Sequence, residues 1–342
     1  MTQTVLLTGA SGYIAKHIAL QLLEAGYNVR GTVRDLSRGA EVTEAIRPHL
    51  KDDSNLETRL AFVALDLTTD TGWTEAMDGV DVLMHTASPF PLDQPKNEDD
   101  LIRPAVDGAM RALRAAHAAE VKRVILTSST AAISGSALPA GDISFDETNW
   151  TDPTDPDAGA YVRSKTLAEQ AAWNFVSKDA PDMHLTTINP GFVLGAPLDQ
   201  HFGTSIQVIE RLLRGKDPML PDIGFSTVDV QDVAEMHVTV INKPETFGQR
   251  IMTVDSFLTF KDIAQAVKAA FPSRRIPTRV APNFLIRILG RFDPTIKSII
   301  PGLGRVDRID NSRARATIGR GMRQARKSVV SSATYLIDNK LV

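Results

Sequence analysis

A short apolar strand, followed at once by a turn of small residues and an amphipathic helix, constrains the fold of this chain most strongly. Residues 4–8 have the sequence Thr-Val-Leu-Leu-Thr, which is a strand pattern, and two glycines stand in residues 9–12. Apolar residues then recur on one helical face at Ile14, Ile18 and Leu22, and Gly26 ends this periodicity. A strand that turns directly into a helix is the first half of a crossover unit and predicts a parallel sheet.

The same alternation continues through the first half of the chain. Further strands are predicted at residues 29–33, 60–65, 80–85, 124–128 and 185–189, and a helix at residues 99–119. Beyond residue 190 a helix is predicted at 203–214, a strand at 250–254 and a helix at 260–270, which Thr259 caps. The basic segment 305–327 is interpreted as a solvated helical surface. The predicted fold class is α/β, a doubly wound parallel sheet of Rossmann type with a smaller, interleaved C-terminal region.

The composition excludes several classes of function. The 342 residues include 38 lysines and arginines and 41 acidic residues, a net charge of −3 that gives no reason to expect nucleic acid. The absence of cysteine excludes a disulfide scaffold, cysteine-ligated metal and a thiol nucleophile. The 7 histidines are scattered, so no metal site is predicted, and His85 and His237 are interpreted as packing residues. With no signal-peptide pattern and no run of about 18 apolar residues, we expect a cytoplasmic protein without a membrane partner.

The glycine turn predicts a dinucleotide site. Gly9, Gly12 and Ala15 stand three residues apart between the strand and the helix. Small residues there let the backbone approach a pyrophosphate, and the helix N-terminus offers free N–H groups. An ordinary strand-to-helix turn is the alternative. A P-loop is excluded because Lys16 lacks the Gly-Lys-Ser/Thr arrangement of that motif.

The end of the second predicted strand indicates which dinucleotide binds. Arg34 and Asp35 follow Val33, and Arg38 comes shortly after. A guanidinium suits the 2′-phosphate of NADP, whereas a carboxylate at the ribose would favour NAD. The two arginines predict NADP(H), and Asp35 keeps NAD open as the alternative.

A tyrosine and a lysine four residues apart form the candidate catalytic motif. Tyr161 and Lys165 share one face of a predicted helix, and a strand ends earlier in the chain at Ser128 and Ser129. An isolated Tyr-x-x-x-Lys occurs by chance, but here it accompanies the glycine turn and the serine-bearing strand end. A cation beside a phenol favours the phenolate, which lowers the pKa of the tyrosine.

With these residues the chain resembles the extended short-chain dehydrogenase/reductase family. Within that family it is similar to the group of dihydroflavonol reductases, cinnamoyl-CoA reductases and microbial methylglyoxal or ketone reductases. The resemblance covers nearly the whole length, and besides Tyr161 and Lys165 it rests on residues 8–14, 33–35, 85–89, 104–108, 127–129, 189–195 and 228–234.

The resemblance implies an NADPH-dependent carbonyl reductase that transfers a hydride reversibly between nicotinamide and carbonyl. It implies that Tyr161 is the general acid or base, that Lys165 lowers its pKa and binds the nicotinamide ribose, and that Ser129 rather than Ser128 binds the carbonyl oxygen. The cofactor-binding residues it implies are Gly9, Ser11, Gly12, Tyr13, Ile14, Arg34, Arg38, Asp66, Leu67, Thr86, Ala87, Ser88, Thr127, Tyr161, Lys165, Pro190, Gly191, Val193 and Ser205. The substrate-binding residues it implies are Phe90, Ser129, Ala131, Tyr161, Phe192, Thr204 and Phe225.

One departure from the family pattern bears on the substrate. Ser134 stands where plant flavonoid reductases carry asparagine, so we expect a small or medium aldehyde, ketone or keto ester instead of a flavonoid. The alternatives are a nucleotide-sugar epimerase or dehydratase of the same family and a non-catalytic NADP-sensing regulator. The predicted cofactor domain comprises residues 1–190 with about 226–256 returning to it, and residues 191–225 and 257–342 form the substrate region. A monomer or homodimer is expected.

Overall fold

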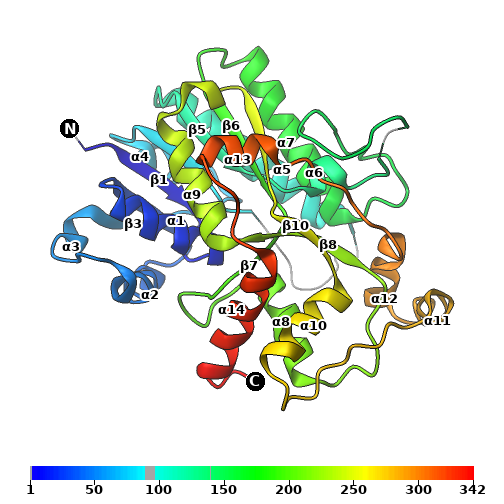
Figure 1. Cartoon of the computed structure of the whole chain (residues 1–342). Helices are drawn as coiled ribbons and strands as arrows, with labels where there is room; N and C mark the ends of the chain where they lie inside the picture. The colour runs from blue at the N-terminus through cyan, green and yellow to red at the C-terminus, as the bar shows by residue number, and fades with distance from the viewer. Residues whose placement is uncertain (1, 89–96, 139) are drawn as a thin grey trace.

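Seven parallel strands form the central sheet of the computed structural model, which describes residues 2–88, 97–138 and 140–342. The strands are β1 (Thr4–Thr8), β2 (Asn28–Val33), β3 (Leu60–Ala64), β4 (Val82–His85), β5 (Arg123–Thr127), β6 (His184–Pro190) and β9 (Gln249–Thr253). Their spatial order is β3-β2-β1-β4-β5-β6-β9, and every pairing is parallel (Figure 1). The predicted doubly wound sheet is confirmed, and each predicted strand of this sheet lies within two residues of the observed limits.

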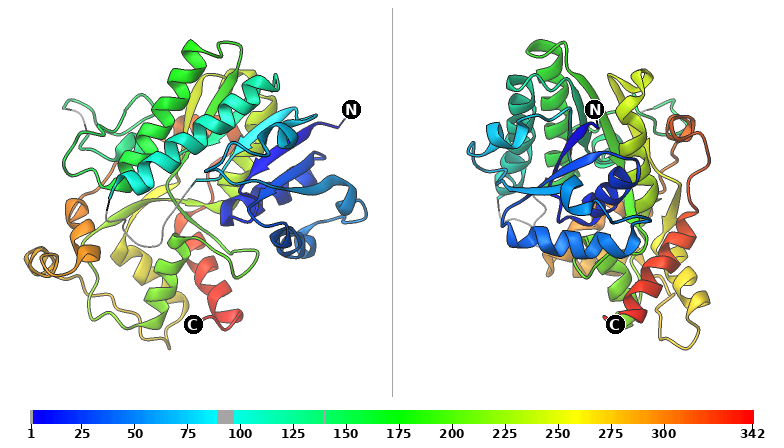
Figure 2. Two further views of the ribbon diagram at one scale, coloured as in Figure 1. Left: turned by 180° about the vertical axis from the view of Figure 1, so that it is seen from behind. Right: turned by 90° about the vertical axis from the view of Figure 1, so that its left-hand side faces the viewer.

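Helices cover both faces of this sheet (Figure 2). One face packs against α1 (Tyr13–Glu24), α2 (Ser37–Ile46), α9 (Val230–Thr239) and α13 (Ser312–Ile318). The other face packs against α4 (Trp73–Met77), α5 (Asp99–Ala118) and α7 (Ala160–Lys178). On β1, Val5 and Leu7 enter the first core while Leu6 enters the second, as the two-residue period of a strand requires.

A second, three-stranded sheet lies beside the first. It contains β7 (Phe192–Leu194), β8 (Gly224–Asp229) and β10 (Ser256–Thr259), with β7 parallel and β10 antiparallel to β8. It packs with α8 (Thr204–Arg214), α10 (Phe260–Ala270) and α14 (Ala325–Asp338). Thr259 caps α10 in a reciprocal capping box with Asp262, so the predicted cap is confirmed. The remaining short helices are α3 (Leu56–Arg59), α6 (Ala131–Ser134), α11 (Asn283–Leu289) and α12 (Pro294–Ser298).

Two predictions about the C-terminal half are wrong in detail. Residues 226–229 belong to β8 in the small sheet, whereas the following helix α9 returns to the central sheet. Segment 305–327 is helical only in α13 and at the start of α14. Its Arg320 and Arg323 bind Glu235 and the fully buried carboxylate of Asp232 on α9. The side chains of these arginines are still 35% and 39% exposed, so they lie at the surface and also provide the cationic partner that a buried carboxylate requires.

The chain reverses its winding direction at β1. From β1 it passes to β2 and β3 on one side, and it then crosses to β4, β5 and β6 on the other side. Such a switch point leaves an opening at the carboxyl ends of the strands, where this class of fold binds its ligands. Within the described residues, no helix combines the length and apolar character needed to cross a membrane.

Candidate active site

A cavity of about 520 Å³ opens at the carboxyl ends of β1, β4, β5 and β6. It receives residues from the glycine turn, from the strand ends, from α7 and from the start of α8. The predicted site residues that line it are Gly9, Gly12, Tyr13, Ile14, Thr86, Ser88, Thr127, Ser129, Tyr161, Lys165, Pro190, Gly191, Phe192, Val193, Thr204 and Ser205. The fold therefore brings together residues that are spread over almost 200 positions of the sequence.

The glycine turn brings backbone close to the cavity. Gly9 has a φ of +68°, and a Cβ placed on it would lie 2.9 Å from the Cβ of Ala87. Neither that dihedral angle nor that spacing suits a side chain. Gly12 caps α1, whose first-turn N–H groups have no intrahelical acceptor. A phosphate at this turn would meet free donors and the positive end of the helix dipole.

Three side chains that meet in the cavity carry its proton chemistry. Tyr161 and Lys165 come from successive turns of α7, and Ser129 follows the end of β5. The Tyr161 hydroxyl donates to the Ser129 Oγ at 3.5 Å, and the Lys165 Nζ lies 5.9 Å from the centroid of the Tyr161 ring. The Ser128 Oγ instead donates to the Glu169 carboxylate at 2.5 Å. The geometry therefore favours Ser129 over Ser128 as the serine that meets a substrate.

Burial shifts the pKa values of these groups in opposite directions. Contrary to the lowering expected from Lys165, burial raises the pKa of Tyr161, and the Ser129 hydroxyl opposes that rise. It lowers the pKa of Lys165 to about 8, although the Glu169 carboxylate opposes the decrease. At neutral pH the phenol therefore holds its proton and most of Lys165 is charged.

The histidines at the strand ends make structural contacts. The His85 Nδ1 lies 2.9 Å from the Thr8 Oγ1, and the His237 Nε2 lies 2.7 Å from the Thr127 Oγ1. Burial lowers the pKa of His85 to about 3 and that of His237 to about 4. In the described part of the chain, no three His, Asp or Glu side chains are grouped so that they could hold a metal ion.

Apolar side chains form the side of the cavity that faces the small sheet. Phe192 stacks on Phe225 with ring centroids 4.3 Å apart, and Phe202 lines the cavity beside them. Phe225 lies behind Phe192 rather than on the cavity surface, and Ala131 is the first residue of α6. The predicted substrate residue Phe90 lies outside the described residues.

The other predicted cofactor residues lie outside the cavity lining. They are Ser11, Arg34, Arg38, Asp66, Leu67 and Ala87. Arg34 and Asp35 are exposed just after β2, and the Asp35 Oδ1 accepts the Ser37 N–H at 2.9 Å. Arg38 pairs with Glu41 at 3.2 Å. Asp66 accepts the Thr68 N–H at 2.8 Å at the end of β3, so these residues surround the next strand ends along the sheet.

The structure adds a buried ion pair that the sequence pattern does not reveal. Lys16 on α1 is only 2% exposed, and its Nζ binds the carboxylate of Asp199. Asp199 lies in the segment that leads to Phe202 and Thr204 on the cavity wall. The partners are 183 residues apart, so no local spacing indicates the contact.

We expect Asp199→Asn to lower the free energy of unfolding by about 3 kcal/mol, because it leaves the Lys16 ammonium buried without a counter-charge. The double variant Lys16→Met/Asp199→Asn removes both charges and should recover most of that loss. Urea unfolding of the two variants and the parent measures the difference. A double variant as unstable as Asp199→Asn would contradict this interpretation of the pair.

Comparisons with known proteins agree with the geometry. Residues 5–254 match the NAD dependent epimerase/dehydratase family. The chain belongs to this family. A ketoreductase of Aspergillus niger is 33% identical over 99% of this chain and 98% of its own length. A cinnamoyl-CoA reductase of Medicago truncatula is 35% identical over 82% of this chain and 84% of its own.

Solved structures of family members share the complete fold. The yeast methylglyoxal/isovaleraldehyde reductase, crystallised with NADPH, superimposes with a TM-score of 0.81 at 26% identity, covering 99% of this chain and 100% of that one. The resemblance to the extended short-chain dehydrogenase/reductase family, and to its group of ketone, methylglyoxal and cinnamoyl-CoA reductases, is confirmed.

Proposed function

We propose that this protein is an NADPH-dependent carbonyl reductase that converts aldehydes, ketones or keto esters reversibly to alcohols. The observation that carries the proposal is the meeting of Ser129, Tyr161 and Lys165 in one cavity with the glycine turn. A nucleotide-sugar epimerase would use the same three residue types. The ketoreductase of Aspergillus niger, which this chain matches over almost its whole length, supports the reductase instead.

The cavity and its surroundings fit a dinucleotide. The close approach of Gly9 to Ala87 and the free amides of α1 suit a pyrophosphate. The exposed Arg34 and the partly exposed Arg38 are available for a 2′-phosphate, which a guanidinium binds in a bidentate manner. The yeast reductase crystallised with NADPH supports the same choice of cofactor.

When bound, the reduced nicotinamide supplies the hydride that the carbonyl carbon accepts. Tyr161 is protonated at neutral pH and donates its proton to the oxygen that gains charge. Ser129, within reach of the Tyr161 hydroxyl, donates a hydrogen bond to the same oxygen. The positive charge of Lys165 favours the phenolate that remains. In alcohol oxidation the same groups act in the opposite direction.

The cavity walls support a substrate with an apolar portion. Phe192 and Phe202 line the cavity together with the polar residues, and Phe225 stacks on Phe192. Aromatic walls with a few convergent polar groups are typical of sites for small apolar molecules. A small or medium aldehyde, ketone or keto ester therefore remains the proposed substrate class.

We assign the cofactor to residues 1–190 and the substrate walls mainly to residues 191–225 and 257–342. The catalytic residues and the glycine turn precede residue 190, whereas Phe192, Phe202 and Phe225 follow it, which supports the division. The return of β9 and α9 to the central sheet makes the second region an interleaved one. A cytoplasmic location and a monomeric or homodimeric state stay predictions.

The direct test is a panel of aldehydes, ketones and keto esters offered to the purified protein with NADPH and, separately, with NADH. Consumption of NADPH with formation of alcohol is expected for at least one class of carbonyl. Tight NADPH binding without turnover across the panel would point to a sensor, and turnover of nucleotide sugars without net NADPH consumption would point to an epimerase.

Removal of the guanidinium at the end of β2 should weaken NADPH binding selectively. We expect Arg34→Ala to raise the Kd for NADPH about 10- to 100-fold, because a charge-assisted contact contributes about 1.5–3 kcal/mol, and to leave the Kd for NADH nearly unchanged. Arg103→Ala, at an exposed arginine of α5, is the matched control and should change neither value. Equal weakening of both nucleotides in Arg34→Ala would contradict the assignment of Arg34.

A further inference from the structure

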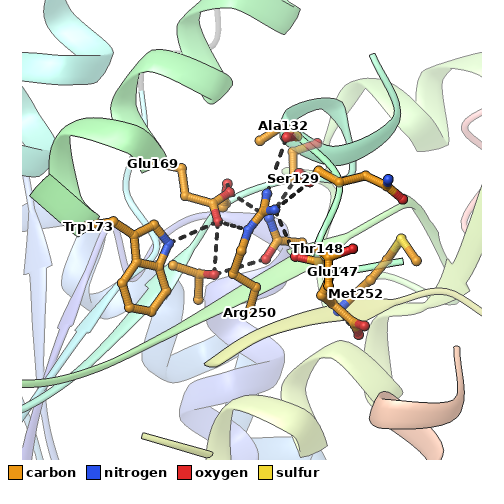
Figure 3. A network of polar contacts seen from close by, with 12 residues as sticks. Ser129, Ala132, Glu147, Thr148, Glu169, Trp173, Arg250 and Met252 are labelled. Carbon is orange, nitrogen blue, oxygen red and sulfur yellow. Dashed lines mark hydrogen bonds and ion pairs between the residues drawn. The ribbon is translucent and has the colours of Figure 1, made fainter. Parts of the chain in front are cut away.

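A buried carboxylate lies on the same face of α7 as Tyr161 and Lys165. Glu169 follows Tyr161 and Lys165 at the same four-residue spacing and is 1% exposed. Its two oxygens accept five hydrogen bonds, from Ser128 at 2.5 Å, Thr187 at 3.0 Å, Asn189 at 2.6 Å, Trp173 at 3.3 Å and Arg250 at 2.6 Å. Figure 3 shows the Glu169 carboxylate between Trp173, on the same helix, and Arg250.

Arg250 on β9 provides the counter-charge and extends the network beyond α7. Its Nε binds the Glu169 Oε1, and its Nη1 donates to the carbonyl oxygens of Glu147 at 3.0 Å and Asn149 at 2.6 Å. Its Nη2 donates to the carbonyl of Ala132 in α6 at 3.2 Å. One buried guanidinium thus connects β9, α7, α6 and the segment before Trp150. The Arg250 Cζ also lies 3.6 Å from the centroid of the Trp150 ring.

The network reaches Ser129 by two routes. The Ser128 hydroxyl, adjacent in the chain to Ser129, donates to Glu169. The Asn189 Nδ2 donates to both the Glu169 carboxylate and the main-chain carbonyl of Ser129, the latter at 3.2 Å. The position of Ser129 relative to Tyr161 therefore depends on the Glu169 network as well as on the contact between the two hydroxyls.

A buried ion pair is a poor source of stability by itself, because the desolvation of two charges offsets their attraction. Glu169 lies on α7, the helix of Lys165, and binds Ser128, which lines the cavity next to Ser129. We propose that Glu169 and Arg250 form a brace that positions Ser129 and Lys165 for catalysis. The inference rests on the proposed carbonyl reduction and adds two positioning residues to it.

Charge supports the same conclusion for Lys165. The Glu169 carboxylate raises the pKa of Lys165, against the larger effect of burial. Among the residues that the structure describes, Tyr161 on the same helix and His85 at the end of β4 are the other titratable groups that interact with Lys165. His85 has its pKa lowered to about 3 and stays neutral over the useful range. Loss of the Glu169 charge should therefore let Lys165 lose its proton at a lower pH.

The test is Glu169→Gln, which keeps the side-chain shape and removes the charge. We expect kcat to fall about 10- to 100-fold, the Kd for NADPH to change less than about threefold, and the alkaline limb of the kcat profile to move about one unit toward lower pH. Arg250→Lys should lower kcat in the same way, because one ammonium cannot replace the guanidinium contacts.

Arg123→Lys is the matched control for Arg250→Lys. Arg123 is also 7% exposed, but it stands at the opposite end of the sheet and binds the carbonyls of Val240, Ile241 and His184. It should lower stability and leave kcat of the folded protein unchanged. If Glu169→Gln does not fold, Thr187→Val carries the test, because it removes one donor to the carboxylate and should lower kcat several-fold.

Unchanged kcat and pH profile in folded Glu169→Gln, or in Thr187→Val where the former is unfolded, would overturn the brace. An equal loss of kcat in Arg123→Lys would also overturn it, because the effect would then follow from burial alone. Failure of the proposed function is recognised separately, because the parent protein would then turn over no carbonyl of the panel.

Discussion

Tyr161→Phe is expected to lower kcat for carbonyl reduction by about a thousandfold while the protein still folds and binds NADPH. The variant loses one oxygen, which is the only atom of this side chain that can donate a proton. General acid catalysis by a positioned group contributes about 10²–10⁴-fold, so its loss should dominate the change. Steady-state rates with the best carbonyl of the panel, together with NADPH titrations, measure both quantities.

Ser128→Ala is a useful comparison for that variant. Both serines follow β5, but Ser128 donates to Glu169 and Ser129 faces Tyr161. We expect a smaller loss of kcat in Ser128→Ala than in Ser129→Ala. Turnover by Tyr161→Phe at a rate near that of the parent would refute the role of Tyr161.

Gly191→Ala is expected to destabilise the protein by about 3 kcal/mol or more. Gly191 joins β6 to β7, where the chain passes from the central sheet to the small one. A Cβ there would lie 2.0 Å from the main-chain carbonyl oxygen of Ser226 and 3.2 Å from Val254. The obstacle is backbone within β8, so relief requires a shift of one sheet relative to the other.

Urea unfolding without nucleotide measures this effect separately from cofactor binding. Gly321→Ala is the matched control, because a Cβ at Gly321 meets nothing within 4 Å, and it should change stability by less than about 0.5 kcal/mol. A Gly191→Ala variant as stable as Gly321→Ala would contradict this prediction, because it would show that the two sheets can move apart at residue 191 without loss of stability.

The central sheet follows from local patterns in the sequence. β-branched runs bounded by turn residues predict its strands closely, and the glycine turn after β1 indicates a parallel arrangement. The strands with which β8 pairs cannot be predicted from the local sequence. Residues 224–229 have an ordinary strand pattern, and their pairing with β7 and β10 places them in the small sheet.

The candidate site divides in the same way. Residues in compact motifs, such as Tyr161, Lys165 and the glycine turn, are recognisable because their spacing is set by one helix or one turn. The contacts of Lys16 with Asp199 and of Glu169 with Arg250 join positions 183 and 81 residues apart, so their partners appear only in the folded chain. The sequence does repeat the four-residue spacing of Tyr161 and Lys165 once more, at Glu169, and this repeat could have indicated that Glu169 belongs to the site.

The basic residues near the C-terminus show what the charge of a segment does not indicate. A segment rich in arginine is usually solvated, and composition cannot indicate that Arg320 and Arg323 meet Asp232. That carboxylate is buried by the packing of α9, and the arginines neutralise it.

The most direct test of the central claim follows the transferred hydrogen itself. NADPH with deuterium at its transferable position is incubated with the protein and a reactive carbonyl, and the alcohol is analysed by mass spectrometry and NMR. The proposed function predicts one deuterium on the carbinol carbon for each NADPH consumed, and about a thousandfold less deuterated alcohol with Tyr161→Phe over the same time. Deuterium retained on the nicotinamide across the whole carbonyl panel would contradict it.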